Sequence, residues 1–328
     1  IEANPDFVAP DYRRNEVLGF LKNETLEDLC ISRPKERLEW GIPLPFDPDY
    51  VTYVWFDALT NYLSIPRSRG EEAELWPANI HVIGKDILRF HAVFWPAMLM
   101  SAGLPLPQRV FGHGFLTREG QKMGKSLGNV LDPELLLERC GSDAVRWYLL
   151  RDIQFGDDGD FQQQRFIDLV NNDLANTIGN LLNRTSSMAR KWFDDGVPPA
   201  GAASGADHPL ALKAAETVST VMEAMPQLAF KTAAESILQL AIAANGHLND
   251  TAPWSRMKEP GQEASVAEDL FAVLETTRIV GLLLAPLLPD LSERILSQLG
   301  ESLDPNNWSN QLNWGRLCSG SALPKPTP

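Results

Sequence analysis

The sequence contains few cysteines and no long apolar run. Only three cysteines occur in 328 residues, namely Cys30, Cys140 and Cys318, and they show no CxxC spacing. A disulfide framework or a zinc site within this chain is therefore not expected, and a reducing compartment is favoured. No stretch approaches the roughly 20 apolar residues of a membrane span, and the first residues do not resemble a secretory signal.

Basic residues are also scarce, and the formal net charge is −14. A general nucleic-acid binder normally carries a basic surplus, so that class of protein is disfavoured. A specific RNA contact is still compatible with the sequence, because the local field decides it rather than the summed charge. Residues 161–191 are mildly basic, with Arg165, Arg184, Arg190 and Lys191 against Asp168 and Asp173.

The hydrophobic pattern predicts an α/β domain followed by an all-α domain. A chain of 328 residues is long enough for two hydrophobic cores. Residues 1–50 are rich in Pro, Arg and Glu and show little periodicity. Strands and helices are then predicted to alternate at Tyr53–Phe56, 57–64, His81–Ile83, 86–100 and Arg109–Phe111. Such alternation is typical of a parallel sheet.

From Pro133 onward nearly every periodic segment is predicted to be helical. These helices cover 133–140, 143–150, 161–193, 208–227, 230–248, 264–285 and 289–299, with Gly and Pro clusters between several of them. Antiparallel helices with short links form a bundle. The expected divisions are 1–50, 51–128, a linking helical region at 129–160, a helical domain at 161–302 and an irregular, Pro-rich linker at 303–328.

Two lysines three residues apart form the most specific feature of the sequence. Lys122 and Lys125 lie in GQKMGKSLGN, between Gly120 and Gly128. Such a loop can close over a polyphosphate and place both ammonium groups on oxygens that gain charge as pyrophosphate leaves. A basic surface turn is the alternative for any isolated K-x-x-K, so the interpretation depends on the surrounding sequence.

Aromatic and polar side chains follow two of the predicted strands. The first segment is YVWFDALTNY at 53–62, in which aromatics around Ala58 would line a slot for a long apolar side chain. The second is HVIGKDILRFH at 81–91, where Gly84 permits close approach and Asp86 could accept hydrogen bonds from ribose hydroxyls. Ligands of open α/β sheets bind at the carboxyl ends of strands. Ordinary core packing is the alternative for each aromatic residue.

Asparagines recur on one face of the helix predicted at 161–193. Asparagine is a mediocre helix former, and a solvated face would usually carry Glu and Lys. A row of amides that ends in an arginine suits the reading of base edges, because amides both donate and accept hydrogen bonds. Helix capping is the alternative. The row is Asn172, Asn176, Asn180 and Arg184, and the core stripe beside it is Leu174, Ile178, Leu181 and Leu182.

The lysine segment KMGKS resembles the KMSKS signature of class I aminoacyl-tRNA synthetases, which activate an amino acid as its adenylate and transfer it to tRNA. The preceding FGHGFLTREG, at 111–120, is similar to the run into that loop in methionine–tRNA ligases. The resemblance implies that Lys125, supported by Lys122, acts on ATP. Gly124 departs from the serine of the signature. The implied ATP site also includes Gly124, Ser126, Gly84, Asp86, His113 and Gly114.

The resemblance to methionine–tRNA ligases covers about residues 36–300. It implies the second half of a Rossmann-like, parallel-sheet catalytic domain, followed by an antiparallel helical-bundle domain that binds the anticodon. A methionine thioether among aromatic side chains is physically sensible. Leu59 departs from the proline of some members. The implied methionine pocket is Trp55, Ala58, Leu59, Tyr62, Ile87 and His91.

The same resemblance implies an anticodon site of Asn180, Arg184 and Trp254, with Trp254 stacked on the anticodon cytosine. Without the resemblance, Pro253-Trp254 would be the start of a helix with a core tryptophan. The implied partners are methionine, ATP as its magnesium complex and methionine tRNA with the anticodon CAU, and no membrane. A zinc ion is implied only for an upstream insert, and the implied location is the cytoplasm, a mitochondrion or a chloroplast stroma.

Three alternative functions fit the sequence less well. Synthetases for leucine, isoleucine, valine or cysteine share the lysine loop, but the pocket residues and the Asn180, Arg184 and Trp254 set favour methionine. A non-catalytic RNA-binding protein has no need of the loop. An unrelated α/β nucleotide-binding protein leaves three motif matches to chance. Because the HIGH-like motif of the family does not occur, the chain is expected to be a C-terminal fragment that alone does not form methionyl adenylate.

Overall fold

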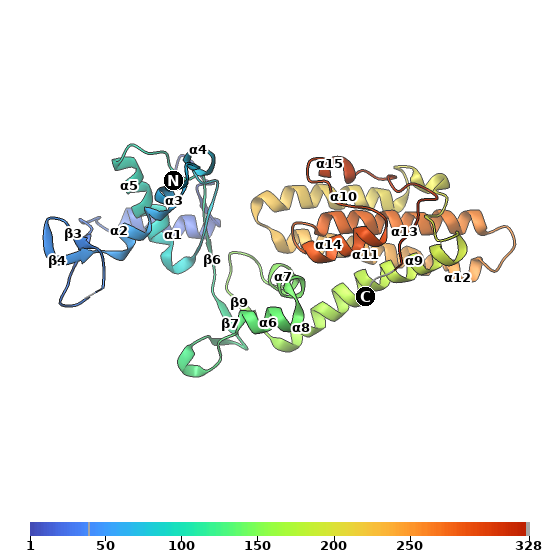
Figure 1. Cartoon of the computed structure of the whole chain (residues 1–328), viewed down its shortest axis with the longest axis horizontal. Coiled ribbons are helices and arrows are strands. Elements are labelled where there is room, and N and C mark those ends of the chain that lie inside the picture. Colours follow the sequence, from blue (N-terminus) through green and yellow to red (C-terminus); the bar gives the residue numbers. More distant parts are fainter. Residues whose placement is uncertain (39, 326–328) are drawn as a thin grey trace. The chain divides into compact units, whose positions relative to one another are not determined.

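The computed structural model describes residues 1–38 and 40–325 (Figure 1). These residues pack as two compact units. Unit 1 contains residues 1–115 and 156–158, and unit 2 contains residues 116–155 and the chain from residue 159 on. Each unit has its own hydrophobic core and is described separately. The α/β and then all-α order predicted from the sequence is confirmed.

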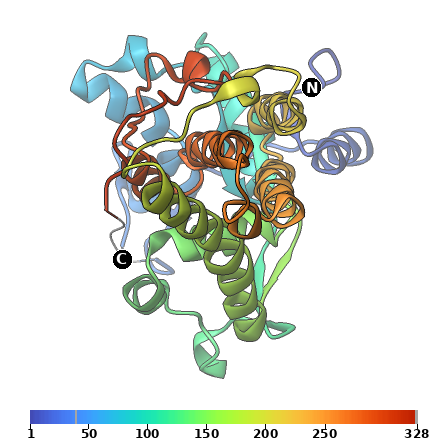
Figure 2. The same cartoon turned by 90° about the vertical axis from the view of Figure 1, so that its right-hand side faces the viewer.

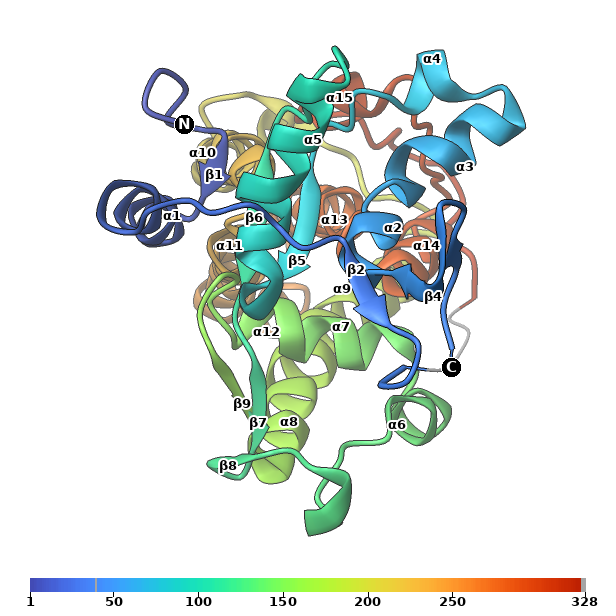
Figure 3. The same cartoon turned by 90° about the vertical axis from the view of Figure 1, so that its left-hand side faces the viewer.

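A three-stranded parallel sheet organises unit 1. Strand β6 (Val110–His113) lies between β1 (Val8–Ala9) and β5 (His81–Gly84), as Figure 3 shows. Both neighbours pair in parallel register with β6. The parallel sheet predicted from the alternating pattern is thus confirmed. Its side chains pack in a cluster that includes Phe7, Val8, Val17, Ile83, Leu88, Ala92 and Val110.

The first 50 residues are more regular than the sequence indicated. Strand β1 leads directly into helix α1 (Asp11–Asn23). A strand of two residues has no periodicity of its own and exists only through pairing with β6, so no sequence pattern indicates it. The remaining helices of unit 1 include α3 (Asn61–Arg69), α4 (Glu72–Leu75) and α5 (Trp95–Ser101), with a 3₁₀ turn at Lys85–Ile87 and a π-helical segment at Phe90–Phe94.

The strand predicted at Tyr53–Phe56 is wrong. Strand β4 (Asp47–Thr52) ends before it and pairs antiparallel with β2 (Ser32–Pro34) and β3 (Pro43–Leu44), while Val54–Ala58 forms helix α2. A short apolar run cannot distinguish a strand from a helical turn. Because β4 lies outside the parallel sheet, the rule that ligands bind at the carboxyl ends of parallel strands does not apply to this segment.

Unit 2 begins with a small sheet and two helices. Strand β7 (Leu116–Arg118) pairs antiparallel with β8 (Gln121–Lys122) and parallel with β9 (Gly159–Phe161). Helices α6 (Pro133–Cys140) and α7 (Ser142–Arg151) follow the hairpin and match the predicted helices closely. The domain limits expected from the sequence at residues 128 and 160 differ from the unit limits, because this hairpin packs with β9.

Figure 2 shows the bundle helices, whose bounds lie close to the predicted ones. The helix predicted at 161–193 consists of α8, a π-helical segment and α9, because ten residues within it form wider turns. Helix α13 packs against α9, α10, α11 and α14, and its side chains are buried on nearly every face. The elements are α8 (Gln163–Leu169), the π segment (Val170–Gly179), α9 (Asn180–Trp192), α10 (Pro209–Ala224), α11 (Phe230–Thr251), α12 (Pro253–Arg256), α13 (Glu263–Leu284) and α14 (Pro289–Gln298).

The C-terminal segment, expected to be an irregular linker over 303–328, is packed on the bundle over its described part. It contains the short helix α15 (Trp308–Gln311) and buries Leu312, Leu317 and Leu323 in the bundle core. These leucines are widely spaced in a Pro- and Ser-rich segment, so no helix or strand periodicity indicated that the segment packs on the bundle. Residues 326–328 of the expected linker lie outside the described residues.

A buried ion pair holds that segment. Glu275 and Arg278 of α13 are almost inaccessible to solvent and form a bidentate pair, with Arg278 Nε 2.9 Å from Glu275 Oε2. Arg278 also donates to the carbonyl oxygen of Gln311 at 2.5 Å, and Glu275 accepts from the N–H of Leu317 at 3.1 Å.

Among the described helices, none is long and apolar enough to cross a membrane.

Candidate functional site

The loop that carries the two lysines is held at its base by Asp160. Strands β7 and β8 are joined at Glu119 and Gly120, both of which have left-handed backbone conformations (φ 50° and 75°). Asp160 Oδ1 accepts hydrogen bonds from Gly120 N–H at 2.8 Å and from the Thr117 hydroxyl at 2.7 Å. These hydrogen bonds, with one from Gln162, hold the pKa of the Asp160 carboxyl below its usual value. The turn between β7 and β8 is therefore tied to β9.

Asn129 closes the lysine loop, residues 120–128, from the other side. Its Oδ1 accepts from Gly124 N–H at 2.9 Å, and its Nδ2 donates to the Lys122 carbonyl at 3.1 Å. Lys122, Lys125 and Ser126 are exposed. Sequence reasoning did not single out Asn129, since an asparagine after a glycine has no distinctive pattern.

Two glycines of the predicted ATP site have different structural roles. Gly124 is extended, and a Cβ there would lie 3.7 Å from Leu127 Cδ1, an ordinary contact. The serine of the KMSKS signature would therefore fit at this position. Gly114 lies against the backbone of Asp157 and Asp158, so close that any side chain would collide with it. Backbone packing therefore requires a glycine at position 114, whether or not a nucleotide binds there.

The turn after β5 carries Gly84 and Asp86. The Asp86 carboxylate folds back over Gly84, where a Cβ would lie only 2.7 Å from Asp86 Oδ1. Lys85 between them donates to both carboxylate oxygens of Asp158 at 2.7 Å, and Phe115 N–H donates to the same carboxylate. The hydrogen bonds from Lys85 and Phe115 keep the pKa of Asp158 low. The turn is therefore fixed while Asp86 stays exposed.

His113 ends β6, the strand beside β5. Its Nδ1 lies 2.8 Å from the carbonyl oxygen of Gly114. Through the pairing of Gly84 with His113, the structure brings the β5 turn and the end of β6 to the same edge of the parallel sheet. Three predicted ATP-site residues of unit 1, Gly84, Asp86 and His113, therefore lie near one another.

Tyr62 and His91 form the polar centre of an aromatic cluster in unit 1. His91 Nδ1 lies 3.0 Å from the Ile87 carbonyl oxygen, so this nitrogen carries the proton and donates. The other nitrogen, Nε2, then accepts from the Tyr62 hydroxyl at 2.9 Å. Burial lowers the pKa of His91, which favours this neutral form.

Aromatic rings surround this pair. Trp55 stacks on Phe90 with 4.4 Å between ring centroids and meets His91 edge-on at 6.0 Å. His81 is buried, lies 4.3 Å from the Tyr62 ring and has an Nε2 without a hydrogen-bond partner. Phe90 and His81 were not predicted, because ring contacts between separate segments leave no mark in sequence spacing.

The structure does not gather all six predicted pocket residues. Trp55, Tyr62 and His91 lie together, as described above. Ala58 ends α2 on the turn before α3. Leu59 is buried in a core cluster with Leu63, Trp76, Trp95 and Leu99. The Ile87 side chain packs against the core of the parallel sheet, so only its carbonyl group reaches His91.

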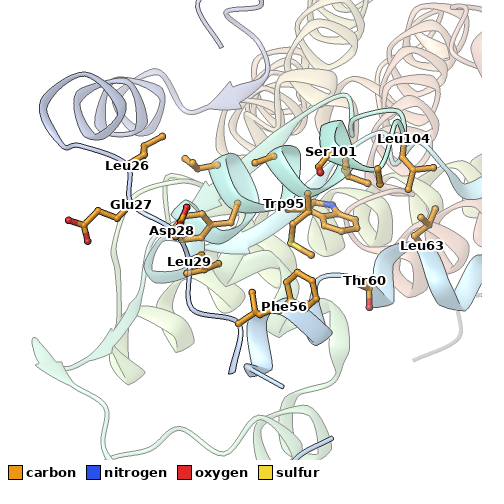
Figure 4. Close-up of a pocket in the computed structure, with 17 residues that line it drawn as sticks. Leu26, Glu27, Asp28, Leu29, Phe56, Thr60, Leu63, Trp95, Ser101 and Leu104 are labelled. Atoms are coloured by element: carbon orange, nitrogen blue, oxygen red, sulfur yellow. The ribbon is translucent and has the colours of Figure 1, made fainter. Parts of the chain in front are cut away.

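An apolar cavity of about 800 Å³ lies in unit 1 (Figure 4). Phe56 and Trp95 are on its wall, and Leu26 and Leu29 come from the segment after α1. None of the six predicted pocket residues lines it. The cavity borders the ring cluster around Tyr62, because its wall residue Trp95 has its ring centroid 6.3 Å from that of Tyr62.

In unit 2, Arg184, Asn249 and Trp254 form a second cluster, termed the Trp254 cluster below. The Arg184 guanidinium carbon lies 5.2 Å from the centre of the Trp254 ring, and Arg184 Nη2 donates to Asn249 Oδ1 at 3.3 Å. The side chain of Trp254 is 38% exposed. The sequence suggested Arg184 and Trp254 but gave Asn249 no role of its own.

The asparagine row lies on the exposed side of the helix that contains Arg184. Asn172, Asn176 and Asn180 are exposed, whereas Ile178, Leu181 and Leu182 are buried. The predicted two-faced character is therefore confirmed. Residues Val170–Gly179 are π-helical, and Asn245 Nδ2 donates to the Thr177 carbonyl at 3.1 Å. Asn180 starts α9, one turn before Arg184.

Among the residues that the structure describes, no three His, Cys, Asp or Glu side chains gather as metal ligands.

Known proteins resemble this chain along its whole length. The profile of the family described as "tRNA synthetases class I (M)" matches residues 2–186, and that of the "Anticodon binding domain of methionyl tRNA ligase" matches residues 197–327. A methionine–tRNA ligase of Thermosynechococcus vestitus is 48% identical over 99% of this chain. The chloroplastic/mitochondrial methionine–tRNA ligase of Arabidopsis thaliana is 45% identical over 99% of the chain.

The chain spans only part of these relatives, 64% of the first and 54% of the second. The methionyl-tRNA synthetase of Mycobacterium tuberculosis, solved with methionyl-adenylate, superposes with a TM-score of 0.91 and 43% identity. This match covers 99% of the chain and 64% of the solved one. Because the first profile matches more than half of the sequence, the chain belongs to the family of class I tRNA synthetases described as "tRNA synthetases class I (M)".

Proposed function

We propose that this chain is part of a methionine–tRNA ligase, an enzyme that activates methionine with ATP and transfers it to methionine tRNA for protein synthesis. AMP and diphosphate are the other products. The observation that carries the proposal is the Trp254 cluster, because it joins an exposed aromatic ring, a fixed guanidinium and an amide on one surface. Such a combination suits unstacked bases better than duplex RNA.

The anticodon-binding role belongs to Asn180, Arg184 and Trp254. An exposed indole can stack on a base, which contributes about 1–3 kcal/mol. The Arg184 N–H groups and the Asn180 amide then supply donors and an acceptor for base edges. The proposed partner is methionine tRNA, with the CAU anticodon read through its cytosine.

The lysine loop supplies the charge for the phosphates of ATP, which is used as its magnesium complex. Lys125 is the proposed catalytic residue and Lys122 its support, since both ammonium groups are exposed on a loop fixed by Asn129. Gly124 and Ser126 belong to the same loop. Gly84, Asp86, His113 and Gly114 are proposed for the nucleotide, with Asp86 accepting from the ribose hydroxyls. Structural zinc is proposed only for an upstream insert, not for this chain.

Methionine is the proposed amino acid. Trp55 and Tyr62 offer aromatic surface to a soft thioether, and neutral His91 fixes the Tyr62 hydroxyl through its Nε2. Leu59 supports Trp55 from the core, Ile87 orients His91 through its carbonyl oxygen, and Ala58 lies on the turn before α3. The catalytic step itself needs no covalent nucleophile, because positioning and charge stabilisation drive adenylate formation.

The domain assignment proposed from the sequence places the end of a connecting insert at 1–50, half of the catalytic domain at 51–128, a linking region at 129–160 and the anticodon-binding domain at 161–302. The chain alone is proposed not to form methionyl adenylate, since the HIGH-like motif is absent from it. ATP–pyrophosphate exchange dependent on methionine tests this claim. The proposed location is the cytoplasm, a mitochondrion or a chloroplast stroma, and the Arabidopsis thaliana relative is described as chloroplastic/mitochondrial.

Charging of methionine tRNA by the longer protein that contains this chain tests the proposed activity. Lys125→Ala is expected to lower kcat by roughly 10²-fold or more, as for the loss of other transition-state charge stabilisers. Lys213→Ala, which removes an exposed lysine of α10, is the matched control and should leave kcat unchanged. Unaltered kcat in Lys125→Ala, or charging with another amino acid, would contradict the proposal.

A further inference from the structure

Trp254 lies on a helix that is too short to be stable without contacts to the rest of the bundle. Helix α12 has only four residues, Pro253–Arg256, and so short a helix is not stable by itself. It follows Ala252, whose backbone is left-handed (φ 40°, ψ 58°). A residue with a Cβ adopts this conformation only when its surroundings enforce it. Something outside α12 must therefore fix the direction of the indole.

The side chain of Arg256 supplies that restraint. Its Nη1 donates to Asp269 Oδ2 at 2.6 Å, and its Nε donates to Gln262 Oε1 at 3.3 Å. Its Nη2 also donates to the hydroxyl of Ser265. Arg256, the last residue of α12, is thus bonded to the start of α13. It lies two residues after Trp254.

Asp269 also contacts α11. Its second oxygen, Oδ1, lies 3.1 Å from His247 Nε2, and the His247 carbonyl accepts from the Thr251 hydroxyl at 2.8 Å. Burial acts to raise the pKa of Asp269, but the hydrogen bonds and charges of His247 and Arg256 outweigh it and leave the pKa lowered. One carboxylate therefore joins the helices on both sides of the Ala252 turn.

We propose that Arg256, Asp269 and His247 form a positioning network, termed the α12 clamp, that holds Trp254 in place for stacking on an anticodon base. The inference rests on the proposed anticodon-binding function and deepens it. None of the three side chains needs to contact RNA. Their effect on binding runs through the orientation of Trp254 beside Arg184.

The test is a double-mutant cycle on the chain, measured as its affinity for methionine tRNA and for the same tRNA with an altered anticodon, at fixed salt. The ratio of the two affinities defines anticodon preference. Asp269→Asn is expected to reduce this preference roughly five- to tenfold, a large part of what base stacking contributes. In a Trp254→Ala background the same substitution should change nothing further.

A purely structural role would act differently, since Asp269→Asn would then weaken both RNAs alike and in both backgrounds. Glu263→Gln, which removes one charge from an exposed site on α13, controls for the change in net charge. Arg256→Lys keeps the charge but loses the planar guanidinium with its several donors, so it should also reduce the anticodon preference. It replaces Asp269→Asn in the test if that variant does not fold.

The outcomes separate the two proposals. If the unsubstituted chain prefers the native anticodon and the clamp variants keep that preference in full, the clamp is overturned while the anticodon function stands. If the unsubstituted chain shows no preference, the anticodon function is overturned and the clamp with it. A loss of preference that disappears in the Trp254→Ala background supports the clamp.

Discussion

The guanidinium carbon of Arg184 lies 5.2 Å from the centre of the Trp254 ring, and the same guanidinium donates to Asn249. Arg184 is on α9, whereas Asn249 and Trp254 lie on either side of the break between α11 and α12. The arginine is thus held between a ring and an amide before any RNA arrives. Preorganisation of this kind lowers the cost of binding, because fewer side chains must be ordered.

Replacing Arg184 by lysine tests this arrangement. The charge is kept, but the planar guanidinium, which can contact a ring and an amide at the same time, is lost. Binding of methionine tRNA is expected to weaken by about 2 kcal/mol, the usual contribution of a hydrogen bond to a charged group. Fluorescence anisotropy with labelled tRNA measures it. Arg190→Lys, on the same helix but paired with Asp195, is the control and should bind normally. Equal effects of the two substitutions would contradict the prediction.

Asn129→Ala is expected to loosen the lysine loop. The substitution removes the acceptor for Gly124 N–H and the donor to the Lys122 carbonyl. Hydrogen exchange at Gly124 should become about fivefold faster, corresponding to roughly 1 kcal/mol for a lost hydrogen bond. Gly124→Ser is the matched comparison and should leave exchange across the loop unchanged, because a Cβ fits there. Unaltered exchange in Asn129→Ala would show that the loop is held by other contacts.

Glu275→Ala should destabilise the bundle strongly. It leaves Arg278 buried without its partner, and the loss of one member of a buried pair costs about 3–5 kcal/mol. The urea midpoint of the bundle transition gives the change in the free energy of unfolding. Glu216→Ala removes the same charge from an exposed pair of equal spacing on α10, and its effect should stay below about 1 kcal/mol. A small effect of Glu275→Ala would mean that the pair is not needed to hold the C-terminal segment.

Unit 1 should lose stability below neutral pH because of His81. Burial lowers the pKa of His81 to about 4, whereas the unfolded histidine titrates near 6.5. Between these values the unfolded chain binds a proton that the folded chain excludes, so acidification favours unfolding. From pH 7 to pH 5 the expected loss is about 2 kcal/mol, at 1.36 kcal/mol per unit. Buried His91 contributes with the same sign.

Urea unfolding at pH 7 and pH 5, followed by hydrogen-exchange mass spectrometry of peptides from β5 and β6, measures this effect. His81→Gln removes the titrating group and should flatten the dependence on pH. An equal slope in the variant and the unsubstituted chain would exclude His81 as its source.

The long helices were predictable, because apolar residues recur in each over several turns between Gly- and Pro-containing breaks. Helix α13 illustrates this point, since its predicted range 264–285 and observed range Glu263–Leu284 differ by one residue at each end. Strand β1 and helix α2 were not predictable, because a two-residue strand depends on its partner and a short apolar run fits either structure.

The candidate sites show the same division. Lys122, Lys125 and Trp254 lie in contiguous motifs and could be named from the sequence. The groups that hold them, including Asn129 for the loop and Asp269 for α12, act through contacts between separate segments. The motif around Leu59 predicts a place in a ligand pocket, yet the Leu59 side chain is in the core.

The most direct test of the account is the binding of this chain to methionine tRNA and to the same tRNA with altered anticodon bases, at one moderate salt concentration. The account predicts a strong preference for the native anticodon that is lost in Trp254→Ala. Equal, weak and salt-sensitive binding of both RNAs would contradict it, and would leave the chain a class I synthetase whose anticodon contacts lie elsewhere.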